Sequence, residues 1–193
     1  MTTQTTAILF ASALLGLSPT SATAQTASFD RITAAATGDW NQDGVADLAL
    51  LVSPENGDGD IAIHIFLYSG EANRLVAQTV APDKVWGDFQ MAGRQPSISA
   101  TANGSIIVTS HNDSIGRDRW EQKLTLAYRN FDFVVAGYTY NSYDTLDPDN
   151  VTNCDFNVLT GKAERNGKAL RVAPQMLSLD DWSDDVGQKV CNP

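Results

Sequence analysis

The chain has few basic residues, few histidines and few cysteines. Its 193 residues include 13 Lys and Arg against 23 Asp and Glu, which gives a formal net charge of −10 at pH 7. Nucleic acid and anionic membrane surfaces repel so acidic a chain, and we expect neither as a partner. With only His64 and His111 present, proton transfer by histidine has few candidate groups.

The sequence also lacks an apolar run that would span a membrane. The run from Ala7 to Leu17 is too short for a transmembrane helix, and Ala22-Thr23-Ala24 fits a small-x-small cleavage site. We therefore predict a signal peptide at residues 1–24 and a mature periplasmic or secreted chain, 25–193, with no membrane insertion. Because MTTQTT before the run has no Lys or Arg, a disordered or buried N-terminus remains the alternative.

Only two cysteines are present, Cys154 and Cys191. An even number of cysteines in an exported chain is typical of a disulfide, because the compartment is oxidising. No His or third Cys stands near either residue, which argues against metal binding by the thiols. We predict a disulfide between them that ties down the C-terminal tail.

Strand patterns, by contrast, are abundant. Short alternating segments are separated by turn residues, and helical spacing occurs near the C-terminus at Leu179, Trp182 and Val186. The predicted strands are residues 28–36, 47–53, 61–69, 74–80, 97–102, 105–111, 119–129, 133–140, 155–160 and 168–173. This pattern predicts an all-β fold, an antiparallel meander of about ten strands with one short C-terminal helix. Twisted sheets, a sandwich and a partial propeller-blade arrangement all remain open.

The strands form two groups within one predicted domain. A blade-like unit is expected at residues 28–81 and a second β unit at 95–193, with residues 82–95 as the link. In the second unit, Asn103-Gly104 is a strong hairpin signal, and residues 161–167 are predicted as a turn-rich connection. The pattern does not distinguish one continuous sheet from two packed sheets.

Oxygen-bearing side chains recur at alternate positions in TGDWNQDGVADLAL, residues 37–50. Calcium prefers six to eight hard oxygen ligands, and alternating positions of a short loop converge on one point. Gly44 permits the sharp turn that such a loop needs. The candidate ligands are the side chains of Asp39, Asn41, Asp43 and Asp47 and the carbonyl of Val45. A plain turn held by side-chain to backbone hydrogen bonds is the alternative.

This loop is not an EF-hand, because its twelfth position is Leu50 and strand patterns flank it. DWNQDGVADL resembles the calcium loop of the FG-GAP/VCBS family, whose repeats read roughly D-x-N-x-D-G-x-x-D-L between two strands of a propeller blade. The resemblance covers about one blade, from near Phe29 to Val80. It implies that the loop binds a structural calcium ion through the ligands just named. One such repeat is recognisable, whereas a closed propeller needs about four blades.

A second candidate site is the segment HNDSIGRDRW, residues 111–120, where polar groups gather at a predicted strand junction. The candidate partner-binding residues are His111, Arg117, Arg119 and Trp120. Pairing of the two arginines with Asp118 or Glu121 is the structural alternative to binding an anionic partner.

Catalytic signals are weak. Ser110, His111 and Asp113 together suggest a triad, but neighbours in a strand point to opposite faces. We expect an exported β domain with a structural calcium ion that binds a protein or glycan partner. The alternatives are a periplasmic inhibitor or immunity protein that uses residues 111–120, and a hydrolase.

Overall fold

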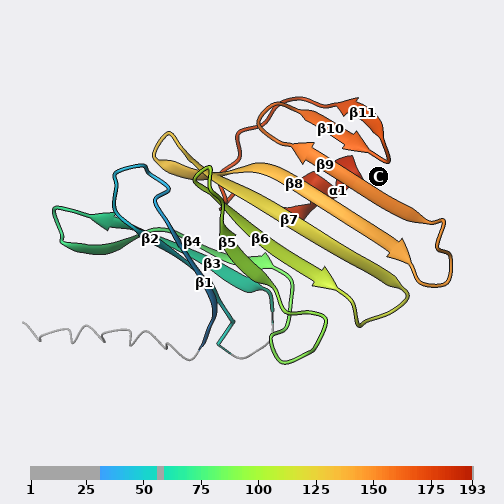
Figure 1. Ribbon diagram of the computed structural model, residues 1–193, viewed down its shortest axis with the longest axis horizontal. Coiled ribbons are helices and arrows are strands. Elements are labelled where there is room, and N and C mark those ends of the chain that lie inside the picture. The colour runs from blue at the N-terminus through green and yellow to red at the C-terminus, as the bar shows by residue number, and fades with distance from the viewer. Residues whose placement is uncertain (1–30, 56–58, 193) are drawn as a thin grey trace, which may run out of the picture.

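Residues 31–55 and 59–192 of the computed structural model are described here, and they form two antiparallel sheets and one helix (Figure 1). We call the four-stranded sheet, of order β1-β2-β3-β4, the small sheet. The seven-stranded sheet, of order β11-β10-β9-β8-β7-β6-β5, is the large sheet. The prediction of an all-β antiparallel fold is therefore confirmed. The predicted signal peptide, 1–24, and the start of the first predicted strand lie outside the described residues.

The small sheet consists of β1 (Ile32–Gly38), β2 (Asp47–Val52), β3 (Ile61–Ser69) and β4 (Arg74–Val85). The large sheet consists of β5 (Ser97–Ala100), β6 (Ser105–Asn112), β7 (Asp118–Arg129), β8 (Asp132–Asp144), β9 (Val151–Asn157), β10 (Lys162–Arg165) and β11 (Lys168–Arg171). The helix α1 (Asp184–Cys191) follows the last strand.

The core lies between the two sheets, because one face of each sheet carries the large apolar side chains. In β3 every second residue is buried, beginning with Ile61 and Ile63. In β6 the buried apolar residues are Ile106 and Val108. These side chains belong to a single cluster that joins both sheets, so the molecule is a two-layered packing of sheets. Edge strand β1 lies beside edge strand β5.

Several sequence predictions were wrong in detail. The strand expected at 155–160 spans Val151–Asn157, and of Leu179, Trp182 and Val186 only Val186 lies in the helix. The segment 161–167, expected to be a turn-rich connection, contains β10. Only one side chain of this short strand, Ala163, is buried, so the sequence carries no alternation that would mark it. The link expected from residue 82 begins later, because β4 continues through Pro82 to Val85. An edge strand tolerates proline, because its outward N–H needs no partner strand.

The C-terminal segment packs against both sheets. Helix α1 begins after Ser183, whose side chain accepts a hydrogen bond from the Asp185 amide, as expected of an N-cap residue. Gly187 faces β8, where a Cβ atom would lie 2.5 Å from the ring of Tyr138, so the helix can approach the sheet closely. On the small sheet, Lys84 Nζ donates hydrogen bonds of 2.8 Å to the carbonyls of Asp180 and Trp182.

Within the described ranges, no helix is both long enough and apolar enough to cross a membrane.

Candidate functional site

The loop between β1 and β2 is organised by side-chain to backbone hydrogen bonds. The carboxylate of Asp39 accepts from the amides of Asp43 (3.0 Å) and Gly44 (2.9 Å). Asp43 in turn accepts from the Val45 amide (2.8 Å) and from the side-chain amide of Asn41 (2.8 Å). Gly44 has a φ of +87°, which glycine adopts without strain. The side chains of Asp39, Asn41 and Asp43 thus lie inside the turn and hold its backbone in place.

Asp47 has a different position from the other acidic residues of the loop. Asp47 is the first residue of β2, and it is only 1% exposed. Its Oδ2 accepts from the Trp40 amide and its Oδ1 from the Tyr68 amide, both at 2.9 Å. The backbone pairing of β2 with β3 stops at Leu48 and Phe66. The amide of Tyr68, further along β3, therefore bonds to the Asp47 side chain instead of to a backbone carbonyl of β2. Asp47 therefore anchors the base of the loop to the small sheet.

The donor set of this loop fits calcium in chemical type, because Asp39, Asn41 and Asp43 supply side-chain oxygens and Val45 a carbonyl. Each carboxylate oxygen that accepts one N–H keeps a second lone pair. Among residues 31–55 and 59–192, no three or more His, Cys, Asp or Glu side chains are close enough together to hold a metal ion. An ion here would therefore depend on the Asn41 amide oxygen and the Val45 carbonyl as well as on the carboxylates. Ligation by Asp47 stays a prediction.

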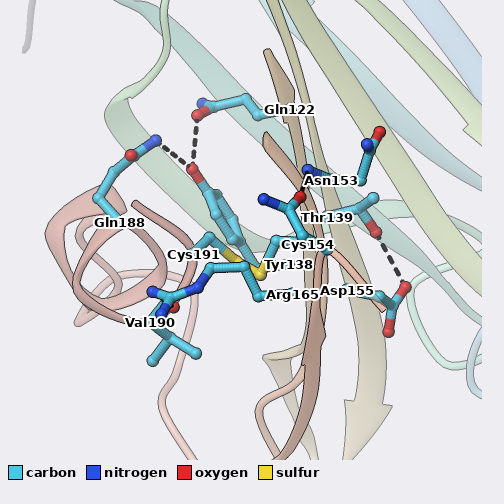
Figure 2. The surroundings of a disulfide bond; sticks show 11 residues. Gln122, Tyr138, Thr139, Asn153, Cys154, Asp155, Arg165, Gln188, Val190 and Cys191 are labelled. Carbon is cyan, nitrogen blue, oxygen red and sulfur yellow. Dashed lines mark hydrogen bonds between the residues drawn. A yellow bond between two sulfur atoms is a disulfide. The ribbon is translucent and has the colours of Figure 1, made fainter. Parts of the chain in front are cut away.

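The predicted disulfide is present and joins β9 to the last residue of α1 (Figure 2). Cys154 and Cys191 are 3% and 0% exposed. Beside them Tyr138 Oη donates to Gln122 Oε1 (3.1 Å) and accepts from Gln188 Nε2 (2.6 Å). Burial raises the pKa of the Tyr138 phenol, so this group stays a neutral link between β7, β8 and α1. The arrangement fastens the helix to the inner face of the large sheet.

In the segment 111–120, the arginines are occupied within the protein. Arg117 forms a two-pronged ion pair with Asp144 at the end of β8, with Nε 2.8 Å from Oδ1. Arg119 donates to the carbonyls of Ile115 (2.9 Å) and Gly116 (2.8 Å). The sequence suggested Asp118 or Glu121 as the partners. Asp144 takes that place because β7 and β8 pair antiparallel, and this brings the end of β8 beside the start of β7.

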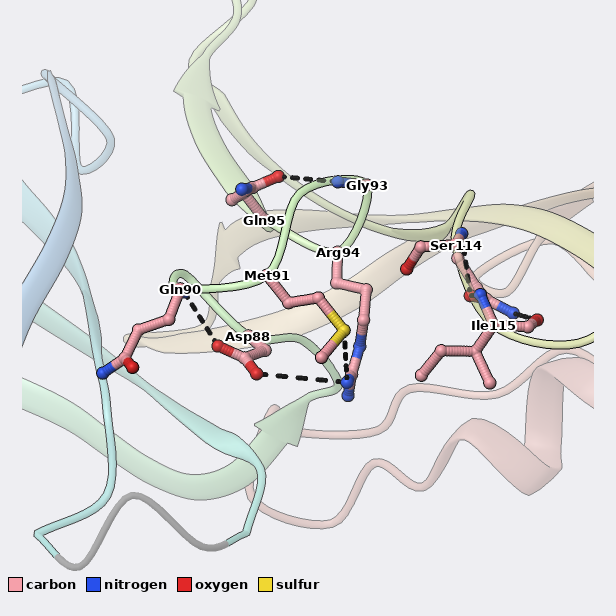
Figure 3. A network of polar contacts seen from close by, with 9 residues as sticks. Asp88, Gln90, Met91, Gly93, Arg94, Gln95, Ser114 and Ile115 are labelled. Atoms are coloured by element: carbon pink, nitrogen blue, oxygen red, sulfur yellow. Dashed lines mark hydrogen bonds and ion pairs between the residues drawn. The ribbon is translucent and has the colours of Figure 1, made fainter.

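Trp120 is half-buried and packs against Trp86, which follows β4, with ring centroids 4.9 Å apart. The guanidinium of Arg94 lies over the Trp86 ring, 4.4 Å from its centroid. Figure 3 shows the surrounding segment, in which Arg94 also approaches Asp88 and Met91. Through Trp120, β7 thus packs against the segment that connects β4 to β5.

The three residues that suggested a triad are not assembled as one. Ser110 is 2% exposed and faces the interior, whereas His111, its neighbour in β6, lies on the outer face. His111 Nε2 is 3.8 Å from Asp113 Oδ2. The other histidine, His64, is half-buried on β3, where burial and the nearby Arg31 lower its pKa.

The Arg117–Asp144 pair makes stability depend on pH. Asp144 accepts hydrogen bonds from Arg117 and from the Leu146 amide, and these bonds hold the pKa of Asp144 below its usual range. The folded pKa is depressed, so the pair stabilises the protein above about pH 4 and this contribution is lost as pH falls through the folded pKa. We expect Arg117→Ala to lower the melting temperature at neutral pH, and the difference from wild type to shrink in acid.

Thermal melts of both proteins from about pH 7 to about pH 2 check this pH dependence. Arg129→Ala is the matched control, because it removes the same charge from an exposed side chain whose hydrogen bond is to the carbonyl of Tyr128. A constant difference between wild type and Arg117→Ala at every pH would contradict the prediction.

The large sheet also has two adjoining hollows, and of the predicted partner-binding residues Trp120 lines one of them. One, of about 510 Å³, lies over β8, β9 and β10. The other, of about 490 Å³, lies over the ends of β7, β8 and β9. Asn141 and Asn153 line both, so we treat the hollows as one groove and call it the outer groove. Its lining residues are separate positions on several strands, and no local motif in the sequence marks them as a group.

Comparisons with known proteins give little further information. No family model and no curated protein matches the chain. A solved structure described as that of a Xanthomonas type IV secretion system related protein is similar over part of its length, with 18% identity and a TM-score of 0.40. The alignment covers 72% of this chain and 57% of that chain. At this identity and score the likeness supports no functional inference.

Proposed function

We propose that this protein is an exported binding domain that recognises a protein or glycan partner and holds a structural calcium ion in its Asp39–Asp47 loop. The observation that carries the binding role is the outer groove, which lies on the face of the large sheet away from the core. The volumes of its two hollows are typical of ligand sites. The Cys154–Cys191 disulfide supports export, because such bonds persist in oxidising compartments.

In this proposal the calcium ion stabilises the connection between β1 and β2. Asp39, Asn41 and Asp43 provide side-chain oxygens, Val45 provides its carbonyl, and Asp47 anchors the base of the loop. The loop's resemblance to FG-GAP/VCBS repeats supports the assignment. The hydrogen bonds that draw Asp39 and Asp43 around the turn form without an ion, as in the plain-turn alternative. The role is structural, because the loop and the outer groove lie on different sheets.

Calcium is expected to raise the melting temperature of the mature chain. A ligand present at about ten times its Kd stabilises the folded state by about 1.4 kcal/mol, or roughly 3–6 °C for a domain of this size. Asp43→Ala should abolish the increase, because it removes an exposed carboxylate of the loop. Differential scanning calorimetry with calcium and with a chelator measures both values.

Asp149→Ala is the matched control, because Asp149 is also an exposed carboxylate but lies in the β8–β9 connection. It should keep the calcium response. If intact protein melts at the same temperature with calcium and with chelator, the calcium part of the proposal is wrong.

The binding role is tested with a bait whose groove is blocked. Asn141 lines both hollows, and Asn141→Trp would fill them with a residue that strands accommodate well. The immobilised wild-type chain should retain a partner from a periplasmic extract that the Asn141→Trp chain does not. The retained material is identified by mass spectrometry for protein and by sugar analysis for glycan. Identical retention by both baits would refute binding through the outer groove.

A further inference from the structure

Strand register brings hydrogen-bonding side chains into rows across the outer face of β8, β9 and β10. Thr139 pairs with Asp155, and Asn141 pairs with Asn153. Because successive residues of a strand point to opposite faces, these four share one face. Figure 2 shows Thr139, Asn153 and Asp155 on the side of the sheet away from the disulfide and α1. The rows continue in β10, where Lys162 pairs with Asn157 and Glu164 pairs with Asp155.

The groove offers both donors and acceptors to a ligand. Asn153, Asp155 and Asn157 in β9 and Lys162 in β10 are solvent-exposed. Asp155 Oδ2 accepts from Thr139 and Asn157 Oδ1 from Thr160, and their remaining side-chain polar groups face solvent. Amides donate and accept, carboxylates accept, and ammonium groups donate. A ligand that matches this mixture carries both donors and acceptors, and each sugar hydroxyl is both.

One end of the groove has an apolar surface beside the polar rows. Tyr143 and Val151 are paired across β8 and β9 and are 51% and 42% exposed. Pro148 lines the same hollow. An exposed tyrosine ring next to planar amides provides a flat apolar surface on which the C–H face of a sugar ring can stack, while the amides bind its hydroxyls.

The charges of the groove oppose an anionic ligand. Asp155 and Glu164 line the first hollow with a single cation, Lys162. Asp113 and Glu121 line the second, where Glu121 is paired with Lys123 at 2.8 Å. In a chain of net charge −10, these carboxylates repel acidic sugars, so a neutral sugar is favoured over an acidic one.

A protein partner fits the groove less well. The centre of a protein–protein interface is depleted of charged residues and contains aromatic or arginine anchors. Here charged and amide side chains occupy the centre, and the exposed tyrosine lies at one end. The two hollows together suit an elongated ligand that runs across several strands.

We propose that the outer groove binds a neutral oligosaccharide, with Tyr143 stacking on a sugar ring and Asn141 and Asn153 bonding its hydroxyls. This inference rests on the proposed function, since it names the chemical class of the partner for the same groove.

The test uses the mature chain and a printed array of neutral oligosaccharides: glucose, mannose, galactose, xylose and N-acetylhexosamine oligomers, with uronic-acid and sialylated oligomers beside them. The strongest neutral oligomer is then titrated by calorimetry. Tyr143→Ala and the double variant Asn141→Ala/Asn153→Ala are each expected to weaken binding at least about tenfold, about 1.4 kcal/mol. Phe131→Ala is the matched control, because Phe131 is an 85% exposed aromatic at the β7–β8 turn, outside the groove. It should bind as wild type does.

Three results would overturn the inference: no neutral oligomer bound, preference for the acidic oligomers, or equal affinity in wild type and Tyr143→Ala. Melting temperatures of all variants verify that each is folded. The extract experiment separates this inference from the binding function itself. If Asn141→Trp loses a protein partner while no sugar binds, the sugar inference fails and the binding function stands. If neither sugar nor protein is retained, both fail.

Discussion

Loss of the Cys154–Cys191 disulfide is expected to lower the free energy of unfolding by about 4 kcal/mol. The two cysteines are 37 residues apart in the sequence, and the chain-entropy model gives about this value for a loop of such length. For a domain of this size the melting temperature should fall by roughly 8–16 °C. This is the largest effect that we predict for any single bond.

The packing around the disulfide explains why its loss is not compensated locally. Helix α1 has eight residues, fewer than an isolated helix needs to be stable in water. Its contacts with Tyr138 through Gly187 and Gln188 form only while the helix is held against β8 and β9. Without the disulfide, the protein would have to order this segment from a much larger set of conformations.

Urea unfolding of wild type with and without reductant measures the loss. The control is a variant with both Cys154→Ala and Cys191→Ala, which should match reduced wild type and be insensitive to reductant. If thiol titration shows full reduction and the unfolding midpoint stays the same, the prediction is wrong.

Asp47→Ala is expected to lower stability by about 3 kcal/mol even without calcium. The substitution removes two charge-assisted hydrogen bonds and leaves the amides of Trp40 and Tyr68 without their acceptor. A buried donor that loses its partner costs about 1–3 kcal/mol. The melting temperature should fall by roughly 6–12 °C.

Two other substitutions identify the cause of this loss. Asp47→Asn keeps one acceptor oxygen and should lose less than Asp47→Ala. Asp43→Ala changes an exposed position of the same loop and should cost under about 1 kcal/mol in the presence of chelator. Chelator melts of the three variants suffice, and equal losses for Asp43→Ala and Asp47→Ala would show that the anchoring role is wrong.

Much of the fold could be predicted from the sequence because the strands are strongly alternating. The pattern of Ile61, Ile63 and Ile65 places one face of β3 in the core, and Asn103-Gly104 forms the turn between β5 and β6. β10 could not be found in this way, because it has four residues and a single buried side chain. Its position depends on pairing with β9, and such pairing leaves no local trace.

The candidate sites were predictable to different degrees. Asp39, Asn41 and Asp43 are close in the sequence, so their spacing alone indicates a loop of gathered oxygens. Asp47 fits the same spacing, but its bond to Tyr68 spans 21 residues and follows from the end of the β2–β3 ladder. Apart from Trp120, the residues of the outer groove were missed for a similar reason, because they converge only through strand register.

The two hydrogen bonds of Lys84 have a consequence for how the molecule is made. They join the last strand of the small sheet to residues 180 and 182, and the disulfide joins the residues just beyond to the large sheet. The final twelve or so residues therefore act as a clasp between the layers. Since a chain is synthesised from its N-terminus, the strands of both sheets are made before residues 180–191. The bonds that hold the two sheets together through residues 180–191 can therefore form only after all of these strands have been made.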